Sequence, residues 1–414
     1  MTYLEGLGKK AVIAGRILAL KSTVEKDAVL EAMAEALINS TDIILEKNQL
    51  DVNSAIKVNM SSAFIDRLTL NEKRVKSMAS GLIDAAKLED PINELIETLE
   101  RPNGLVINKI RVPLGVIGII YESRPNVTSD AAGLCLKTGN PVILRGGSRA
   151  FNTNKAVADV MRNALADTGF PIDCIQLVED TDRKTAVELM RLNKYVNVLI
   201  PRGSASLINE VLKNATVPVI ETGIGICHVY VDCDAELKKA VNITVNAKTT
   251  KPSVCNSAEV LLVHEDIYKQ FLPEVYKGLS EFNVEIRGCE KTCEILPEAI
   301  SAGEDDFDTE FLDYIMAVKV VSGVEEAIAH INTHGTMHSE AIVTENTEKA
   351  EKFTRQVNAA AVYINASTRF TDGGEFGMGA EIGISTQMLH ARGPMGLKEL
   401  TSYKYIIHGT GQIR

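Results

Sequence analysis

The stretch PVILRGGSRA, residues 141–150, decides the fold. Its first half is a short apolar run, which is followed directly by two glycines and a serine. A helical pattern then begins at Asn152, with apolar residues at helical spacing, and ends at Gly169 and Pro171. This segment therefore predicts a β-strand, a glycine turn and an α-helix in succession.

The same alternation continues on both sides of the segment. Runs typical of β-strands cover residues 111–120, 174–178, 195–200 and 217–220, and helical patterns cover residues 182–192 and 204–214. Strands that alternate with helices at this spacing form a parallel sheet with helices on both faces. We therefore predict an α/β fold with a Rossmann-like domain. It follows a helical first hundred residues, with capping boxes at Ser22-x-x-Glu25 and Thr69-x-x-Glu72.

A second α/β region is predicted from about residue 223 to residue 381. Its expected strands include residues 258–263 and 317–321, and the acidic run at residues 304–308 is expected to be a solvated loop. Two further segments, residues 105–110 and 401–407, have the pattern of outlying strands. Such strands are suited to pairing across a subunit interface.

The composition is that of a globular protein with an acidic balance. The 414 residues include 55 acidic and 44 basic side chains, a formal net charge of −11, and this length predicts two or three domains. We find no run of Lys and Arg of the kind that binds nucleic acid. The longest apolar stretch, residues 112–121, is far shorter than the ~20 residues of a membrane helix, and the N-terminus lacks a signal-peptide pattern. We therefore expect neither nucleic acid nor a membrane as a partner.

The chain contains seven cysteines, an odd number with no Cys-x-x-Cys pair. This pattern argues against a disulfide framework in a chain of this length. Because free thiols are typical of a reducing compartment, we expect a cytoplasmic protein.

The turn that follows residues 141–144 has the composition of an anion-binding loop. Its two glycines let a ligand approach the backbone, the following helix N-terminus favours an anion, and two arginines offer charged donors. A surface turn with two solvated arginines is an equal alternative. The residues concerned are Arg145, Gly146, Gly147, Ser148 and Arg149.

The same turn indicates which nucleotide would bind. No strand is followed by a G-x-G-x-x-G motif, and no acidic side chain is placed to hold a free ribose hydroxyl. A serine with arginines on either side suits a 2′-phosphate better. The pattern therefore favours NADP over NAD.

Cys255 has a chemical and a purely structural interpretation. It lies in a polar loop that contains Pro252, just before the expected strand at residues 258–263. A thiol in such a loop is better placed for exposure than one inside an apolar run, and it could act as a nucleophile. The alternative is an ordinary small hydrophobic residue.

A row of histidines invites a metal interpretation. His330, His334 and His338 are spaced four residues apart, but Gly335 should end the helix, so the three need not share a face. No carboxylate or cysteine completes a set at ligand spacing. We therefore expect no metal.

Several segments, taken together and in order, resemble the aldehyde dehydrogenase superfamily over essentially the whole chain. The resemblance is greatest to its members that reduce an acyl phosphate of glutamate. The segments are VPLGVIG at residues 112–118, SRPNVT at 123–128, residues 144–154, ETGIG at 221–225, KPSVCN at 251–256, residues 330–342, and INAST at 364–368 with its continuation at 385–396.

The resemblance implies a catalytic site. Cys255 matches the nucleophilic cysteine, and Asn126 matches the asparagine that forms an oxyanion hole with the backbone N–H of Cys255. Glu221 lies 34 residues before Cys255, as does the general base of hydrolytic members. Because TGIG follows Glu221 instead of the usual LGG, its role stays open.

The resemblance also implies where the cofactor binds. The adenosine phosphate would lie near residues 145–148, and NAD-preferring relatives commonly have a glutamate in place of Ser148. Glu310 matches the glutamate that positions the nicotinamide ribose. The usual Gly-Ser-Thr stretch beside the nicotinamide is PRGS here, at residues 201–204, so Gly203 and Ser204 are expected at the cofactor with altered contacts.

The implied reaction is the NADPH-dependent reduction of L-γ-glutamyl 5-phosphate to L-glutamate 5-semialdehyde and phosphate in proline biosynthesis, through a thioester on Cys255. Arg124 could contact the leaving phosphate, and Ser367 or Arg369 the amino-acid end of the substrate. A surface ion pair is the alternative for each arginine. Two other functions stay open, a hydrolytic NAD(P)-dependent aldehyde dehydrogenase with Glu221 as base and a non-enzymatic or metal-binding protein.

The resemblance finally implies a division into domains. Residues 1–103 and 115–222 would bind NADP, residues 223–381 would form the catalytic domain, and residues 104–114 with 382–414 would form an oligomerisation element. We therefore expect a homo-oligomer, either a dimer or a tetramer. Glutamate 5-kinase, which makes the acyl phosphate, is a candidate partner.

Overall fold

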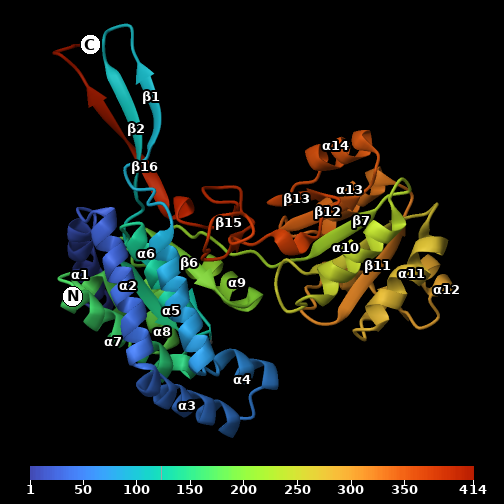
Figure 1. Ribbon diagram of the computed structural model, residues 1–414, viewed down its shortest axis with the longest axis horizontal. Helices are drawn as coiled ribbons and strands as arrows, with labels where there is room; N and C mark the ends of the chain where they lie inside the picture. Colours follow the sequence, from blue (N-terminus) through green and yellow to red (C-terminus); the bar gives the residue numbers. More distant parts are fainter. Residues whose placement is uncertain (123) are drawn as a thin grey trace. The chain divides into compact units, whose positions relative to one another are not determined.

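The fold is described from a computed structural model that covers residues 1–122 and 124–414, without the side chains of residues 62 and 63 (Figure 1). The chain divides into two compact units. The first unit consists of Met1–Glu221, Gly377–Gly383 and Met395–Arg414, and the second of Thr222–Phe376 and Ile384–Pro394. Within the described residues, no helix combines the length and the apolar character needed to cross a membrane.

Five helices come first in the chain. They are α1 (Tyr3–Leu18), α2 (Thr23–Asn39), α3 (Thr41–Lys57), α4 (Ser62–Leu68) and α5 (Glu72–Lys87). The capping box predicted at Ser22 is confirmed, because the Ser22 hydroxyl accepts the N–H of Glu25 and the Glu25 carboxylate accepts the N–H of Ser22. The box predicted at Thr69 is wrong. The Thr69 hydroxyl donates to the carbonyl of Ile65 in α4, and Asn71 caps α5 instead.

A four-stranded parallel sheet lies in the first unit, in the order β5-β4-β3-β6. The predicted alternation of strands and helices is confirmed here, but the described run at residues 217–220 forms only an isolated bridge, between Val219 and Leu199. The elements are β3 (Ile117–Tyr121), α6 (Asn126–Lys137), β4 (Val142–Gly146), η1 (Ser148–Ala150), α7 (Phe151–Asp167), η2 (Ile172–Cys174), β5 (Ile175–Leu177), α8 (Arg183–Met190), β6 (Val198–Arg202) and α9 (Ala205–Asn214).

The apolar run at residues 111–120 belongs to two sheets and is not the single strand that its pattern predicts. Its first residues end β2 (Val106–Pro113), and its last residues belong to β3. Between them, the backbone N–H of Gly115 donates to Asn140 and that of Val116 donates to Asn197. Side chains from elsewhere in the fold thus fix the backbone between the two strands. An apolar pattern by itself does not reveal such contacts.

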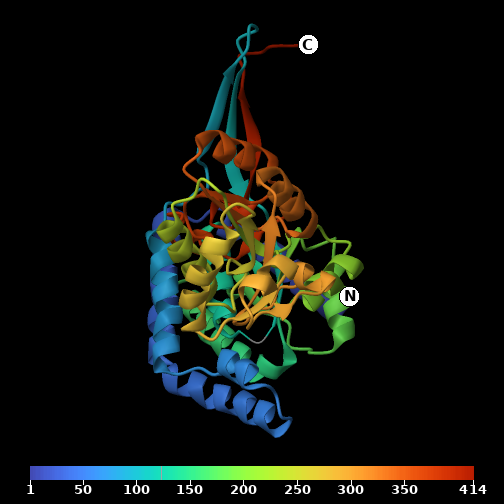
Figure 2. The ribbon, with the colours of Figure 1, turned by 90° about the vertical axis from the view of Figure 1, so that its right-hand side faces the viewer.

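A three-stranded antiparallel sheet extends from the first unit, in the order β1-β2-β16, and we call it the arm (Figures 1 and 2). β1 (Leu95–Glu100) corrects the prediction that the first hundred residues are helical. β16 (Thr401–His408) pairs with β2 along its whole length, as far as the pair His408–Val106. The two predicted outlying strands are therefore confirmed as strands, and they are neighbours. A short turn, η5 (Lys398–Leu400), precedes β16.

The second unit is built on a seven-stranded parallel sheet in the order β10-β9-β11-β8-β7-β12-β13. Apolar residues pack on both of its faces, since Leu261 and Val263 of β8 belong to one core cluster and Val260 and Leu262 to another. The strands are β7 (Cys227–Val231), β8 (Ala258–His264), β9 (Glu285–Gly288), β10 (Ile300–Ser301), β11 (Ile315–Val321), β12 (Ser339–Val343) and β13 (Ala361–Ile364), with a separate pair, β14 (Ile384–Ser385) and β15 (Gly393–Pro394).

Helices and short turns connect the strands of the second unit. They are α10 (Leu237–Thr249), α11 (Tyr268–Ser280), α12 (Glu290–Ile295), η3 (Glu304–Asp308), α13 (Val324–His334), α14 (Thr347–Gln356) and η4 (Thr368–Phe370). The acidic run expected to be a solvated loop is the turn η3. In it Glu304 and Asp305 are exposed, whereas Asp306 pairs with Arg287 at 2.6 Å.

Candidate active site

The predicted cofactor residues of the first unit gather at one edge of its sheet. β3, β4 and β6 are parallel neighbours, and Tyr121, the last residue of β3, pairs with both Gly146 and Arg202. The loops that leave these three strands therefore start side by side, and they carry the regions of Asn126, Ser148 and Ser204. The strand order reverses at β3, and ligands of open α/β sheets bind outside the carboxyl ends of the strands at such a point.

The glycine turn after β4 brings the backbone into close contact with α7. A Cβ atom on Gly146 would lie 2.1 Å from Nδ2 of the buried Asn154, so a side chain there has no room. Ser148 and Arg149 are exposed, and Arg149 makes no hydrogen bond or ion pair to another described residue. Arg145 donates to the carbonyl of Thr181 at 2.9 Å. Arg145 therefore braces the turn, while Ser148 and Arg149 face the solvent.

The N-terminus of α7 already binds a carboxylate. Asp51 of α3 is buried and accepts the N–H and the hydroxyl of Thr153, at 2.8 and 2.6 Å, and the side-chain amide of Asn152 at 2.8 Å. Sequence reasoning missed this residue, since nothing distinguishes Asp51 from other acidic residues of α3. A side chain of the protein itself therefore supplies the negative charge at this helix end, and it lies about a hundred residues earlier in the chain.

Another carboxylate fixes the loop after β6. Glu122, directly after β3, accepts the N–H of Ser204 at 2.9 Å and its hydroxyl at 2.8 Å. Ser204 in turn caps α9. Gly203 and Ser204 are exposed beside this carboxylate. Sequence reasoning also missed Glu122, which stands next to the quoted SRPNVT motif.

Asn126 is the first residue of α6 and is exposed. Its Nδ2 donates to Asp130, one helical turn on, at 2.9 Å. Burial raises the pKa of Asp130 to about 6, and the hydrogen bonds from Asn126 and Ser129 oppose the rise. Arg124 is also exposed, and Ser123 of the same motif lies outside the described residues.

Cys255 lies in the loop between α10 and β8 of the second unit and is half-buried. Gly225 lies very close to this loop. A Cβ atom placed on Gly225 would lie 1.5 Å from the carbonyl oxygen of Cys255. The thiol of Cys227 donates to the same oxygen at 3.1 Å. Any side chain on Gly225 would therefore displace the peptide that carries Cys255.

Glu310 belongs to the same arrangement. One of its carboxylate oxygens accepts the N–H of Gly225 at 2.7 Å. Burial raises the pKa of Glu310, and this hydrogen bond opposes the rise. The structure thus links two predicted site residues, Glu310 and Cys255, through one glycine.

The predicted substrate residues of the second unit lie against the residue after Cys255. The side-chain amide of Asn256 donates to the carbonyl oxygens of Arg369 and Thr371, at 3.3 and 2.9 Å, and the hydroxyl of Thr368 donates to the carbonyl of Asn256 at 2.7 Å. Ser367 is buried and caps the turn η4. Nε of Arg369 is buried and has no hydrogen-bond partner among the described residues.

The predicted residues divide between the units. Cys255, Glu310, Ser367 and Arg369 lie in the second unit, where the contacts above bring them together. The first unit contains Asn126, Arg124, residues 145–149, Gly203 and Ser204. Glu221 ends the long first segment of the first unit and is half-buried.

The three histidines do not gather around one point. α13 ends at His334, as the sequence predicts, and the ring of His334 lies 4.3 Å from that of His330, centroid to centroid. His338 precedes β12, is buried, and contacts the hydroxyl of Ser339 at 2.8 Å.

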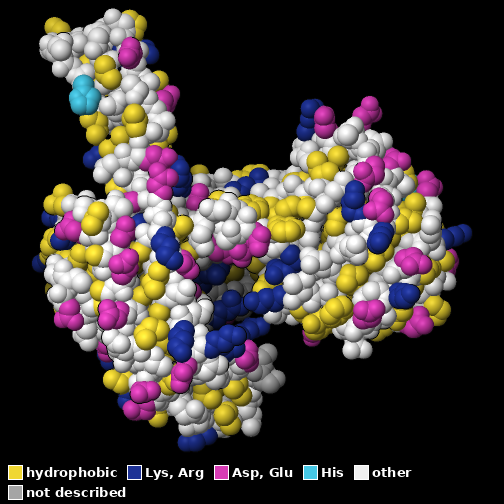
Figure 3. All heavy atoms as spheres, viewed as in Figure 1, with side chains coloured by type: hydrophobic (Ala, Val, Ile, Leu, Met, Phe, Trp, Pro, Cys, Tyr) yellow, Lys and Arg dark blue, Asp and Glu magenta, His cyan; other side chains and the backbone are white. Residues whose placement is uncertain are grey.

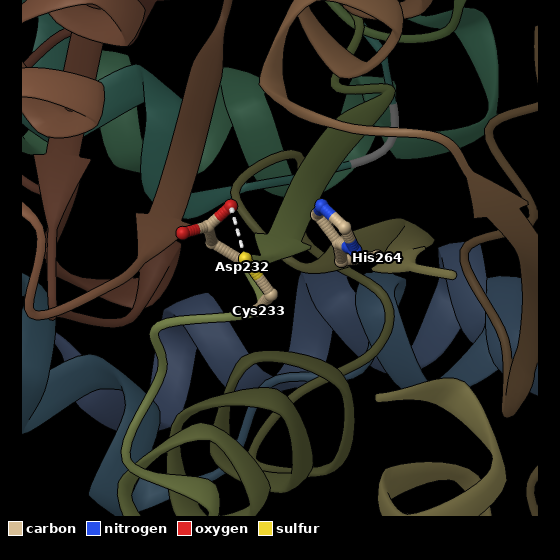
Figure 4. A group of neighbouring side chains, drawn as sticks. All are labelled: Asp232, Cys233 and His264. Carbon is tan, nitrogen blue, oxygen red and sulfur yellow. Dashed lines mark hydrogen bonds between the residues drawn. The ribbon is translucent and has the colours of Figure 1, made fainter. Parts of the chain in front are cut away.

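Another group of side chains among the described residues has the spacing of metal ligands. Asp232 and Cys233 follow β7, and His264 ends the adjacent strand β8 (Figure 4). The ammonium of Lys349 lies 3.0 Å from a carboxylate oxygen of Asp232 and 3.0 Å from the sulfur of Cys233. Because a cationic side chain already neutralises this cluster, a metal ion would have to displace Lys349.

Comparison with known proteins gives a consistent picture. The model of the aldehyde dehydrogenase family matches residues 18–297 and 306–406. The γ-glutamyl phosphate reductase of Clostridium perfringens (strain 13) is 59% identical over 407 residues, 98% of each chain, and that of Carboxydothermus hydrogenoformans is 58% identical over 414 residues, 100% of each chain. The crystal structure of γ-glutamyl phosphate reductase from Thermotoga maritima superposes with a TM-score of 0.98 at 50% identity, over 100% of each chain. The chain therefore belongs to the aldehyde dehydrogenase family, in which these curated relatives bear the name γ-glutamyl phosphate reductase.

Proposed function

We propose that the protein reduces L-γ-glutamyl 5-phosphate to L-glutamate 5-semialdehyde and phosphate with NADPH, as the second step of proline biosynthesis from glutamate. The observation that carries the proposal is the similarity to γ-glutamyl phosphate reductases over the whole length, at 59% identity across 98% of both chains. The contacts of Gly225, Cys227 and Glu310 around Cys255 support it, because a nucleophile has to be held in a defined geometry.

Cys255 is the proposed nucleophile. Its thiolate attacks the acyl carbon, a C–S bond forms, and the C–O bond to phosphate breaks, which leaves a thioester. The backbone N–H of Cys255 and the side-chain amide of Asn126 stabilise the negative charge that develops on the acyl oxygen. Bound NADPH supplies the hydride that reduces the thioester. The C–S bond then breaks and releases the aldehyde and the Cys255 thiolate.

The family implies a nicotinamide cofactor, and we assign NADP. The first unit offers a backbone without a side chain at Gly146 and Gly147, followed by the exposed Ser148 and Arg149, where a 2′-phosphate finds a hydroxyl and a cation. Arg145 braces this turn. Gly203 and Ser204, held by a carboxylate, would bind the nicotinamide half, and Glu310 would position its ribose.

The substrate would be bound by three residues. Arg124 contacts the leaving phosphate. Ser367 and Arg369 bind the amino-acid end, and the buried Nε of Arg369, which has no described partner, provides a donor for a carboxylate. Both belong to the segment that Asn256 holds beside Cys255.

The first experiment is the reverse reaction. The protein is mixed with glutamate 5-semialdehyde and NADP, with and without inorganic phosphate, and the formation of NADPH is followed. We expect NADPH only when phosphate is present, because phosphate has to release the acyl group from Cys255. Equal rates without phosphate would mean that water releases it, and the protein would then be a hydrolytic aldehyde dehydrogenase with Glu221 as base.

The assembly and location are further parts of the proposal. We assign nucleotide binding to residues 1–103 and 115–222, catalysis to residues 223–381, and oligomerisation to residues 104–114 and 382–414, in a dimer or a tetramer. All seven cysteines are unpaired, which fits a reducing compartment such as the cytoplasm. Glutamate 5-kinase, which would supply the acyl phosphate, is the proposed partner.

A further inference from the structure

A buried ion pair joins the two ends of the loop that carries Cys255. Lys248 lies in the last turn of α10, and Glu259 is the second residue of β8. Their Nζ and Oε2 atoms are 2.6 Å apart, and both side chains are fully shielded from solvent. The ten residues between them in sequence include the whole of the loop around Cys255.

Such a pair is a poor way to stabilise a fold. Removing two charges from water costs several kcal/mol per ion, and apolar residues of similar size in their place are often neutral or stabilising. The pair therefore calls for an explanation other than stability. Its neighbours supply one.

Both partners are bonded to further parts of the site. The second oxygen of Glu259 accepts the N–H of Leu312 at 3.2 Å. On the other side, the hydroxyl of Ser257 donates to the carbonyl oxygens of Ala247 and Lys248, at 3.2 and 3.4 Å. The pair thus fixes the start and the end of the cysteine loop and, in addition, a point in the chain just after Glu310.

Leu312 needs such an anchor. Its φ is +54°, a left-handed conformation that is uncommon for a residue with a side chain. The hydrogen bond to Glu259 holds its amide in this conformation. Two residues earlier, Glu310 reaches Gly225, which contacts the carbonyl of Cys255. The contacts therefore connect Lys248 and Glu259 to the segment of Glu310, and that segment in turn to the cysteine loop.

We propose that Lys248 and Glu259 are positioning residues, which hold the Cys255 loop and the Glu310 segment in the relative geometry that the reaction needs. This inference rests on the proposed function of Cys255 as the nucleophile. Burial raises the pKa of Glu259 to about 7 and lowers the pKa of Lys248, as expected for a pair kept in an apolar site.

The test uses two neutral double variants. Lys248→Met with Glu259→Leu removes both charges and the acceptor for Leu312, whereas Lys248→Met with Glu259→Gln keeps an oxygen that can accept its N–H. The matched control is Lys26→Met with Asp90→Leu, another buried ion pair, in the first unit. For each protein we measure the thermal midpoint, kcat, the Kd for NADPH, and the rate at which iodoacetamide alkylates Cys255, followed by mass spectrometry of its peptide.

We expect the Leu variant to fold but to lose more than fivefold in kcat, with a changed alkylation rate at Cys255 and a Kd for NADPH within twofold of the wild type. The Gln variant should recover part of kcat, and the control should keep it. A folded Leu variant whose kcat and alkylation rate both stay within fivefold of the wild type overturns the inference. If the Leu variant does not fold, the Gln variant decides by the same criterion.

The failure of this inference is distinguishable from failure of the proposed function. If the wild-type protein does not carry out the proposed reaction, this is seen directly in its own assay. The alkylation rate of Cys255 reports the geometry of the loop without any turnover. Unchanged alkylation in a folded variant then counts against the positioning role itself.

Discussion

The seven cysteines of the chain differ in their surroundings. Three are buried, and Cys255 is one of four that are half-buried. Among the described residues, Gly225 and the thiol of Cys227 both approach the backbone carbonyl of Cys255. Half-burial alone therefore does not distinguish Cys255 from the other three, whereas the contacts on its backbone do, and they support its proposed role as the nucleophile.

Replacing Cys255, the proposed nucleophile, should abolish the reaction and leave cofactor binding intact. We expect Cys255→Ala to show no turnover, because the thioester cannot form. It should still bind NADPH, which we assign mainly to the first unit, and thermal shift with cofactor measures this. Cys233→Ala is the matched control and should keep its activity within twofold. Normal turnover by Cys255→Ala would rule out the thioester mechanism.

A single methyl group at Gly225 should also reduce the activity. In Gly225→Ala the new Cβ would lie 1.5 Å from the carbonyl oxygen of Cys255, so one of the two backbones has to move. We expect kcat to fall at least tenfold. The control is Gly6→Ala, whose Cβ meets nothing within 4 Å and lies in helix α1, where alanine is favoured over glycine. Unchanged kcat in Gly225→Ala would show that the close approach is not needed.

At the scale of the elements, the local rules predicted several helices and strands correctly. The segment at residues 141–150 is the predicted strand, glycine turn and helix start, and Ser22 caps α2 as its spacing indicates. The errors arise either from a competing residue nearby or from a partner strand. Asn71 caps α5 in place of Thr69, and β1 is a strand because it pairs with β2.

The turn between α13 and β12 buries a histidine that affects stability. Burial lowers the pKa of His338 to about 4, from 6.5. Between these pH values the unfolded chain binds a proton that the folded chain cannot, so stability is complete above pH 6.5 and is lost as the pH falls toward 4. The loss should reach about 3 kcal/mol, at roughly 1.4 kcal/mol per pH unit.

The variant His338→Asn isolates this effect. Lowering the pH from 7 to 4.5 should reduce the thermal midpoint of the wild type more than that of the variant, since only the wild type carries the titrating ring. The carboxyl groups titrate alike in both proteins and cancel in the comparison. An equal or larger drop in the variant would contradict the prediction.

At the scale of the whole molecule, the arm exposes much of its surface to solvent. Tyr403, Tyr405 and Ile407 alternate along β16, and more than half of each side chain's surface is exposed. Figure 3 shows apolar side chains along this sheet. β16 is also an edge strand of the arm, and exposed edges with apolar side chains invite pairing with another chain.

A charge on this strand should therefore weaken assembly. Ile407 is 59% exposed, and we expect Ile407→Asp to lower the molar mass in solution, measured by light scattering after size-exclusion chromatography, because a buried unpaired charge is costly at an interface. Ile413→Asp, at an exposed position beyond the strand, is the control. An unchanged mass for Ile407→Asp would mean that β16 is not part of the proposed subunit interface.

The sequence by itself determined those features of the protein that depend on residues close together in the chain. The strand–turn–helix segments, the outlying strands and the loop position of Cys255 follow from periodicity, capping and turn chemistry, because these act over a few residues. Only the tertiary structure decided the contacts between distant residues. It brings Asp51 to the start of α7, Gly225 against Cys255, and Lys248 against Glu259 in a place shielded from solvent. Those contacts depend on how the elements pack, and the pairing of particular distant residues leaves no periodic signal in the chain.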